Sequence, residues 1–294
     1  MYIMKSLFSL NQFSRWSLMR NFYAKLSYEV VGPNYSRSNV DRIFPTEIQK
    51  PDYAESGMPR KHDNLFHIKK RDEIQKIWNS CRIAKTILMR TGEHLQVDFR
   101  GSNLFANFPK SVTTSVNNIA VHGIPNQRAL KNGDIISIDV SIFHDGFHGD
   151  CCHTFMIGQC DSQARHLINV AELCLYEAIK ICKDKQRISE IGRVIEATAR
   201  KYEMGVVREF CGHGVGRNLH ENPQILHYEH RSDELMYENM VFTIEPIILE
   251  NPTASLVLFD DNWTVATDDD CRSAQFEHTI WIRKNDARIL TKID

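Results

Sequence analysis

Apolar residues recur with a period of about 3.6 residues in three stretches of the chain. The first stretch lies between Asp72 and Leu88, and the others cover residues 167–181 and 188–199. Side chains at this spacing fall on one face of a helix, which then packs against a core. The pattern therefore predicts three amphipathic helices, of which the first ends near Gly92.

A different pattern, with a period of two, marks residues 135–140 as a strand with apolar side chains on one face and Asp139 on the other. The dipeptide Asp145-Gly146 follows and is typical of a hairpin turn. A return strand through residues 148–157 would then bring Asp150 next to Asp139. The sequence predicts that the two carboxylates are neighbours.

Two later stretches, residues 240–249 and 277–282, also have strand patterns. Helices thus precede blocks of strands that we expect to pair in antiparallel fashion. This order is typical of the α+β class, in which helices pack against an antiparallel sheet.

The N-terminal region differs in composition from the rest of the chain. Residues 1–28 hold four basic residues and no acidic residue, a composition typical of a mitochondrial transit peptide, although an ordinary basic, disordered terminus has the same features. Residues 29–65 are polar and interrupted by prolines, which predicts an extended arm. Residues 66–294 remain as the main folded domain.

Composition limits the classes of function. The chain has 294 residues, of which 42% are hydrophobic, so it is long enough to bury a sizeable core. Its net charge of −1 provides no summed field to attract nucleic acid, and no long uncharged apolar segment predicts a membrane span. Because its eight cysteines form no C-x-x-C pair, we expect reduced thiols.

Five potential metal ligands stand where a strand would ordinarily place an apolar or exposed polar residue. They are Asp139, Asp150, His213, Glu245 and Glu277. Each one alone is explained as well by a solvated surface group. Four converging carboxylates would repel one another, however, so their presence together indicates bound divalent cations. Four carboxylates and one imidazole suit a pair of such ions better than a single tetrahedral zinc.

These residues lie within motifs that resemble the type 1 methionine aminopeptidases of peptidase family M24, and the presequence-like start is similar to the mitochondrial (type 1D) branch. The resemblance covers roughly residues 66 to 284. The motifs that carry it are Phe108-Pro-Lys-Ser111, Ser115-Val-Asn117, His122-Gly-Ile-Pro125, Lys131 to Val140, Asp145-Gly-Phe-His-Gly-Asp150, Cys211-Gly-His-Gly-Val-Gly-Arg217, His220-Glu-Asn-Pro223, Thr243-Ile-Glu-Pro246 and Ser273-Ala-Gln-Phe-Glu-His-Thr279.

The resemblance implies the pita-bread fold, in which a central antiparallel sheet has helices packed outside. It also implies roles for the candidate ligands. Asp139 would chelate one metal ion, Asp150 and Glu277 would bridge two ions, and His213 and Glu245 would complete the second, with Glu245 also handling the proton of water. The family accepts cobalt, manganese, iron or zinc.

The resemblance further implies how substrate is bound. His122 and His220 would orient the substrate amide and stabilise the tetrahedral intermediate, although a histidine before Gly-Ile-Pro can also be purely structural. The methionine pocket would use Phe105, Phe108, Leu219 and Trp263, each of which fits a core position equally well. The expected reaction is co-translational or post-import removal of N-terminal methionine, by a mitochondrial monomer, from polypeptides whose second residue is small.

The chain also departs from the family pattern. Phe108 lies only 27 positions after Cys81, where the family has room for a further helix. This shortening keeps open a non-catalytic interaction protein with the same fold. A proline-specific peptidase is a second alternative, because such enzymes use similar ligands, but the motifs that begin at Phe108 and His122 favour methionine.

Overall fold

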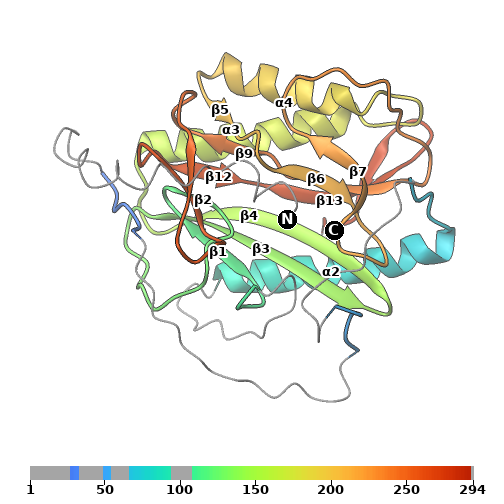
Figure 1. Cartoon of the computed structure of the whole chain (residues 1–294), viewed down its shortest axis with the longest axis horizontal. Coiled ribbons are helices and arrows are strands. Elements are labelled where there is room, and N and C mark those ends of the chain that lie inside the picture. The colour runs from blue at the N-terminus through green and yellow to red at the C-terminus, as the bar shows by residue number, and fades with distance from the viewer. Residues whose placement is uncertain (1–26, 33–48, 54–65, 94–107, 293–294) are drawn as a thin grey trace.

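The computed structural model describes residues 27–32, 49–53, 66–93 and 108–292 (Figure 1). The predicted mitochondrial leader lies almost wholly outside these residues, and so does most of the N-terminal arm. The described parts of the arm contain neither helix nor strand. Residues 94–107, where the family has a further helix, also lie outside the described part of the chain.

The three helices expected from the apolar periodicity are present. They are α2 (Arg71–Glu93), α3 (Ser162–Lys180) and α4 (Ser189–Lys201). The first helix ends one residue beyond the predicted Gly92. Each buries the face that carries the apolar residues, and the buried residues of α2 include Ile77, Ala84 and Leu88. The helical pattern was therefore sufficient to place these elements.

The predicted hairpin consists of β3 (Ile135–His144) and β4 (Phe147–Met156), which pair in antiparallel register over their whole length. Asp145 and Gly146 both have positive φ, of 49° and 80°, as a two-residue hairpin turn of this kind requires. Both faces of β3 near its start are buried. The face that carries Asp139 therefore points into the interior of the protein and not to bulk solvent.

The central sheet has eight strands among the described residues, in the order β1-β3-β4-β13-β8-β6-β7, with β14 paired to β13. Two three-stranded sheets, β10-β11-β2 and β12-β9-β5, complete the β structure of the described residues, and every paired strand is antiparallel. The remaining strands are β1 (Thr113–Val116), β2 (Ile119–Val121), β5 (Gly205–Val206), β6 (Cys211–Gly214), β7 (Glu221–Leu226), β8 (Val241–Ile244), β9 (Ile247–Leu249), β10 (Leu256–Leu258), β11 (Val265–Thr267), β12 (Ser273–Gln275), β13 (Glu277–Ile282) and β14 (Ala287–Ile289).

One predicted strand was wrong in its extent. Residues 240–249 form two strands, β8 and β9, which belong to different sheets. The break falls at Glu245 and Pro246, where proline has no N–H to donate to a ladder. The strand predicted at residues 277–282 is present as β13 with the same bounds.

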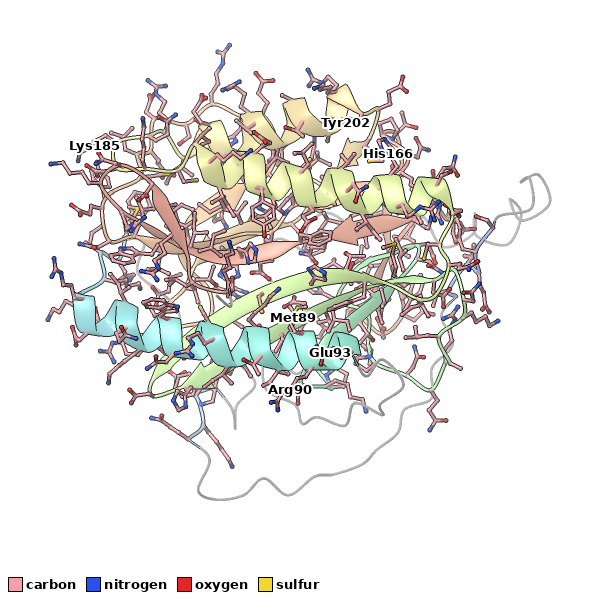
Figure 2. The ribbon with its side chains drawn as sticks, turned by 180° about the vertical axis from the view of Figure 1, so that it is seen from behind. Met89, Arg90, Glu93, His166, Lys185 and Tyr202 are labelled. Carbon is pink, nitrogen blue, oxygen red and sulfur yellow. The ribbon has the colours of Figure 1, made fainter. Side chains whose placement is uncertain are left out.

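The helices lie outside the curled sheet, with α2 against one half and α3 and α4 against the other (Figure 1). Seen from behind, α2 and α3 lie in front of the strands (Figure 2). The backbone of α2 passes so close to β4 that a Cβ on Gly149 would come within 2.3 Å of the Cys81 nitrogen. This close packing holds β4, and with it Asp150, against a rigid helix. The expected α+β architecture is confirmed.

None of the helices in the described residues is long and apolar enough to cross a membrane.

Candidate metal centre

Three neighbouring strands place carboxylates in one row across the central sheet. In the β3–β4 ladder Asp139 lies opposite Cys152, and in the β4–β13 ladder Glu277 lies opposite the same Cys152. Residues directly opposite one another share a face of the sheet, as do residues two apart along a strand. Asp139, Glu277 and Asp150, which is two residues before Cys152, therefore all project from one face.

His213 and Glu245 approach this face from β6 and from the end of β8. The backbone N–H of His213 donates to Oγ1 of Thr243 over 3.0 Å, and that hydroxyl donates to Oε1 of Glu245 over 2.8 Å. Thr243 therefore links the backbone of His213 to the carboxylate of Glu245. The Nε2 atom of His213 lies 3.4 Å from Oε1 of Glu245 and 3.7 Å from Oδ2 of Asp150.

The side chains converge closely enough to share an ion. One ligand atom each from Asp150, His213 and Glu277 lie within 4.8 Å of one another. On the other ring nitrogen, His213 Nδ1 lies 3.1 Å from the carbonyl oxygen of Gly214. A proton on Nδ1 would satisfy that contact and leave the Nε2 lone pair directed at the carboxylates, which is the arrangement that a metal-binding imidazole needs.

Burial of these carboxylates raises their pKa values. Desolvation, followed by the charge of Asp150, raises the pKa of Glu245 to about 8, and desolvation raises that of Asp150 to about 6. Desolvation also raises the pKa values of Asp139 and Glu277 well above the ordinary range, and the charges of the nearby carboxylates raise them further. Without cations the cluster would therefore hold protons at neutral pH.

Two of the carboxylate oxygens fit a cation better than they fit the protein around them. Oδ1 of Asp139 and Oε1 of Glu277 are buried and have no hydrogen-bond partner within the described part of the chain. A buried carboxylate oxygen without a donor is costly, and a divalent cation would remove that cost. Four carboxylates with one imidazole are donors that hard and borderline divalent ions accept.

His220 lies next to the candidate ligand His213, and burial, with a smaller contribution from nearby His122, lowers the pKa of His220. The ring of His220 meets that of His213 edge to face, with centroids 4.2 Å apart. Desolvation lowers the pKa of His122 to about 4, so its imidazole is neutral near pH 7. Nδ1 of His122 is shielded from solvent and has no hydrogen-bond partner among the described residues. It is available to a ligand that enters the site.

Aromatic side chains surround His122. Trp263 meets both Phe108 and His122 edge to face, with centroid distances of 5.2 Å and 6.1 Å. Phe210, which the sequence analysis did not single out, also meets His122 edge to face, with ring centroids 5.2 Å apart. Of the other predicted pocket residues, Leu219 is buried directly before His220, and Phe105 lies outside the described residues.

The sequence analysis also missed Thr243. A signal for it was present, because Thr243 and Glu245 are two residues apart in a strand pattern and so share a face. Phe210 had no comparable signal, since its contact with His122 joins segments that are far apart in the sequence.

Residues 67–284 match the family model described as metallopeptidase family M24. The mitochondrial methionine aminopeptidase 1D of Danio rerio is 38% identical over 288 residues, which cover 92% of this chain and 84% of that protein. Its Homo sapiens counterpart is 39% identical, with 85% of this chain and 80% of that protein covered.

Solved structures show the same likeness. A methionine aminopeptidase from Rickettsia prowazekii has a TM-score of 0.72 at 31% identity and covers 78% of this chain and 100% of its own. The Thermotoga maritima methionine aminopeptidase has a TM-score of 0.71 at 32% identity, with the same coverage of both chains. A prolidase from Pyrococcus furiosus reaches a TM-score of 0.59 at 21% identity, covers 77% of this chain and 66% of its own, and supports the fold alone.

Proposed function

Because this chain belongs to metallopeptidase family M24, we propose that its five candidate ligands, three of which converge within 4.8 Å, hold two divalent metal ions and that the enzyme releases methionine from the N-termini of polypeptides. The chain is a metal-dependent methionyl aminopeptidase of the mitochondrial type 1D branch. The observation that carries the metal proposal is the convergence of Asp150, His213 and Glu277 within 4.8 Å.

The proposed division of ligands follows the strands that carry them. Asp139 would hold one ion, Asp150 and Glu277 would be shared, and His213 with Glu245 would hold the other. When bound, such ions lower the pKa of water and polarise a substrate carbonyl. The physiological metal would be cobalt, manganese, iron or zinc, since this donor set accepts each of them.

Glu245 is the proposed proton carrier in the reaction. Its Oε1 accepts a hydrogen bond of 2.8 Å from the Thr243 hydroxyl, which fixes the orientation of the carboxylate. A carboxylate in this position takes the proton of the attacking water and later delivers it to the leaving amine.

The two histidines are proposed to bind the substrate amide. His122 is neutral and has a shielded Nδ1 with no hydrogen-bond partner in the described ranges, while His220 lies against the ring of His213. Donors placed on either side of the scissile amide would orient it and stabilise the oxyanion that develops on its carbonyl oxygen.

The aromatic group next to His122 is the proposed methionine pocket. Phe108 and Trp263 pack edge to face beside that histidine, and Leu219 and Phe105 complete the proposed set. Burial of a thioether side chain against aromatic rings is favourable by ~1.5 to 3 kcal/mol, with sulfur contacts in addition.

We expect purified protein beginning near Ser27 to release methionine from the peptide Met-Ala-Ser but not from Met-Lys-Ser. The family acts when the second residue is small, and a lysine at that position would crowd the site. Mass spectrometry of the products after addition of manganese or cobalt would measure the cleavage of each peptide. Equal cleavage of the two peptides would contradict the proposed specificity.

The alternatives left open by the sequence gain no support. The proline-specific enzymes are similar in fold, at 21% identity or less among those compared, whereas methionine aminopeptidases match at 36–39% over most of the chain. A non-catalytic protein would not need five converging ligands together with two adjacent histidines.

The protein acts in mitochondria, as its 1D relatives are named to do. We propose that it works as a monomer on newly made or newly imported polypeptides and that cleavage within the predicted leader, residues 1–28, leaves Ser27 and Tyr28 on the mature chain. Ser27 Oγ donates to Asp161 over 2.5 Å, and the Tyr28 ring lies 4.4 Å from the guanidinium of Arg272, which is fully buried. Loss of Tyr28 would expose that cation to solvent.

Residues 1–28 are therefore expected to direct a fluorescent reporter into mitochondria, and the processed enzyme is expected to retain Ser27. Fluorescence microscopy tests the first expectation, and mass spectrometry of the N-terminus of the mature protein tests the second. A diffuse cytosolic reporter would rule out the leader, and a mature chain that lacks Ser27 would rule out the proposed cleavage position.

A further inference from the structure

A short loop, residues 215–220, connects β6 to β7 and carries His220. Inside the loop the N–H of Gly216 donates to the carbonyl of Asn218 over 3.0 Å. The N–H of His148 donates to the carbonyl of Gly216 over 2.7 Å, and so ties the start of the loop to β4. The position of His220 therefore depends on how the other end of the loop is held.

That other end is held by a buried ion pair between Lys69 and Glu221. Their side chains are 7% and 4% exposed, and the Lys69 ammonium donates directly to Oε2 of Glu221. Oε1 of the same carboxylate accepts the N–H of Asn218 over 3.1 Å. Glu221 thus joins Lys69 to the loop backbone and directly follows His220 in the chain.

The ion pair also abuts the first part of the loop. A Cβ on Gly216 would come within 2.4 Å of Nζ of Lys69 and 2.7 Å of Oε1 of Glu221. A side chain at position 216 would therefore push the ends of the Lys69 and Glu221 side chains aside, whereas glycine leaves the pair in place. One ammonium therefore lies against both the beginning and the end of the loop.

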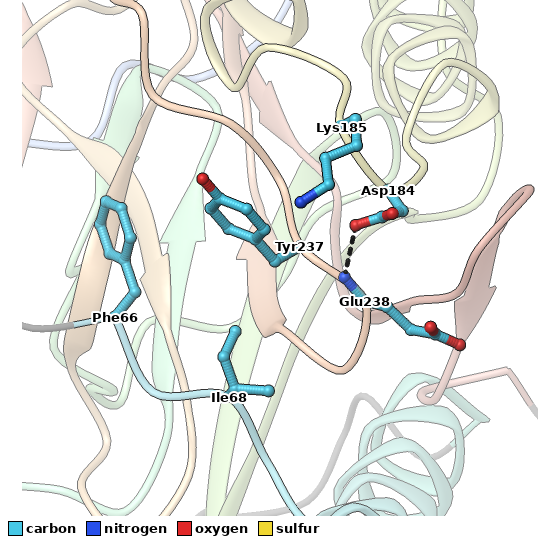
Figure 3. A pocket seen from close by; sticks show the side chains of 6 residues that line it. All are labelled: Phe66, Ile68, Asp184, Lys185, Tyr237 and Glu238. Atoms are coloured by element: carbon cyan, nitrogen blue, oxygen red, sulfur yellow. Dashed lines mark hydrogen bonds between the residues drawn. The ribbon is translucent and has the colours of Figure 1, made fainter.

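In the segment that carries Lys69, an isoleucine is exposed and the lysine beside it is buried, which is the opposite of what is usual for these residue types. Ile68 is 50% exposed and lines a surface pocket (Figure 3), whereas the adjacent Lys69 is 7% exposed. Isoleucine is ordinarily buried and lysine almost never is unless it is paired. The backbone N–H of Lys69 donates to the carbonyl of Asn239 over 3.0 Å, which keeps the segment in this register.

A buried ion pair contributes little net stability, because desolvation of the two charges offsets most of their attraction. Its better attested effect is to specify one geometry, since an unpaired buried charge is strongly unfavourable. By comparison, the ion pair between Arg217 and Glu73 ties the same loop to α2 at the surface, where Arg217 is 67% exposed. Surface pairs of that kind hold a loop only weakly.

We propose that Lys69 and Glu221 are positioning residues that fix His220 against His213, and so set its place beside the substrate amide. This inference rests on the proposed aminopeptidase function for its effect on catalysis. Lys69 and Glu221 touch no reacting atom in this scheme. They act through the loop, and His220 makes the contact with substrate.

The test uses Lys69→Met, Glu221→Gln and the double variant Lys69→Met/Glu221→Gln in the protein that begins near Ser27 and runs to the C-terminus. Each single change leaves one buried charge unpaired and is expected to lower the melting temperature, whereas the double variant removes both charges and recovers most of it. The double variant should still show a kcat roughly 10- to 100-fold below wild type, because the catalytic group is misplaced. KM and bound metal should change little.

A second background separates positioning from general structural damage. In His220→Ala protein, the same double change should lower kcat no further, since the residue it acts through is already gone. Lys180→Met, which removes an exposed lysine paired with Glu177 on α3, is the matched control and should leave kcat unchanged. An equal fall of kcat in both backgrounds, or a wild-type kcat in the folded double variant, would overturn the proposal.

A readout independent of activity is the ring carbon–proton NMR signal of His220, identified by its loss in His220→Ala. It should shift or broaden in the double variant and stay in place in Lys180→Met. An unchanged His220 signal would overturn the positioning role. Lack of metal-dependent activity in the wild type would instead count against the proposed function, while the NMR signal would still decide the inference.

Discussion

Replacement of Glu245 by alanine is expected to abolish methionine release. The change removes a metal ligand next to His213 and the proposed proton carrier together, and loss of acid–base catalysis alone lowers kcat by about 10²- to 10⁴-fold. Steady-state hydrolysis of Met-Ala-Ser measures the effect. Circular dichroism should show an unchanged fold, because Glu245 lies at a strand end between β8 and β9.

Two further variants separate the roles of this carboxylate. Glu245→Gln preserves the size of the side chain and should be almost as inactive as alanine, since an amide cannot take up the proton of water. Glu238→Ala, at an exposed position on the preceding turn, should have wild-type activity. Full activity of Glu245→Ala would rule out the mechanism proposed above.

Removal of metal is expected to have an effect of similar size. Chelation should reduce peptidase activity to background, and divalent manganese or cobalt should restore it, because the buried oxygens of Asp139 and Glu277 find no hydrogen-bond donor among the residues that the structure describes. Activity after dialysis against a chelator, followed by titration with each metal, gives the measurement. Undiminished activity in protein shown to be free of metal would exclude the metal centre.

Metal binding should also depend on pH. The carboxyl groups must lose their protons to bind a cation, and in the metal-free protein burial raises the pKa of Asp150 to about 6 and that of Glu245 to about 8. Apparent affinity should therefore rise as pH increases from 6 to 8, with release of protons. Isothermal titration in two buffers of different ionisation enthalpy would detect the protons, and a pH-independent affinity would contradict the electrostatics described here.

Much of the fold follows from local pattern. The three helices lie where the apolar period placed them, and the hairpin of β3 and β4 turns at Asp145 and Gly146 as predicted. These features are readable because side-chain direction along a helix or strand depends on local geometry alone. The same rule placed Asp139 on the face of β3 opposite its apolar residues.

Other features were not readable from local pattern. Several strands of the central sheet are only a few residues long and carry glycine or polar residues, as β6 does at Cys211–Gly214. Residues 240–249 were predicted as one strand, and the structure divides them between two sheets at Glu245. The choice of sheet depends on partners that are distant in sequence, so no local period reveals it.

By itself, the sequence determined the α+β class, the helices, the central hairpin and the residue types able to hold a cation, because these depend on periodicity and on side-chain chemistry. Only the tertiary structure decided that Asp139, Cys152 and Glu277 share one row, that Thr243 links His213 to Glu245, and that Lys69 reaches Glu221 under the loop of His220. Each of these contacts joins strands or segments whose register is set by packing across the whole sheet, and the free energy of that packing is shared among residues far apart in the chain.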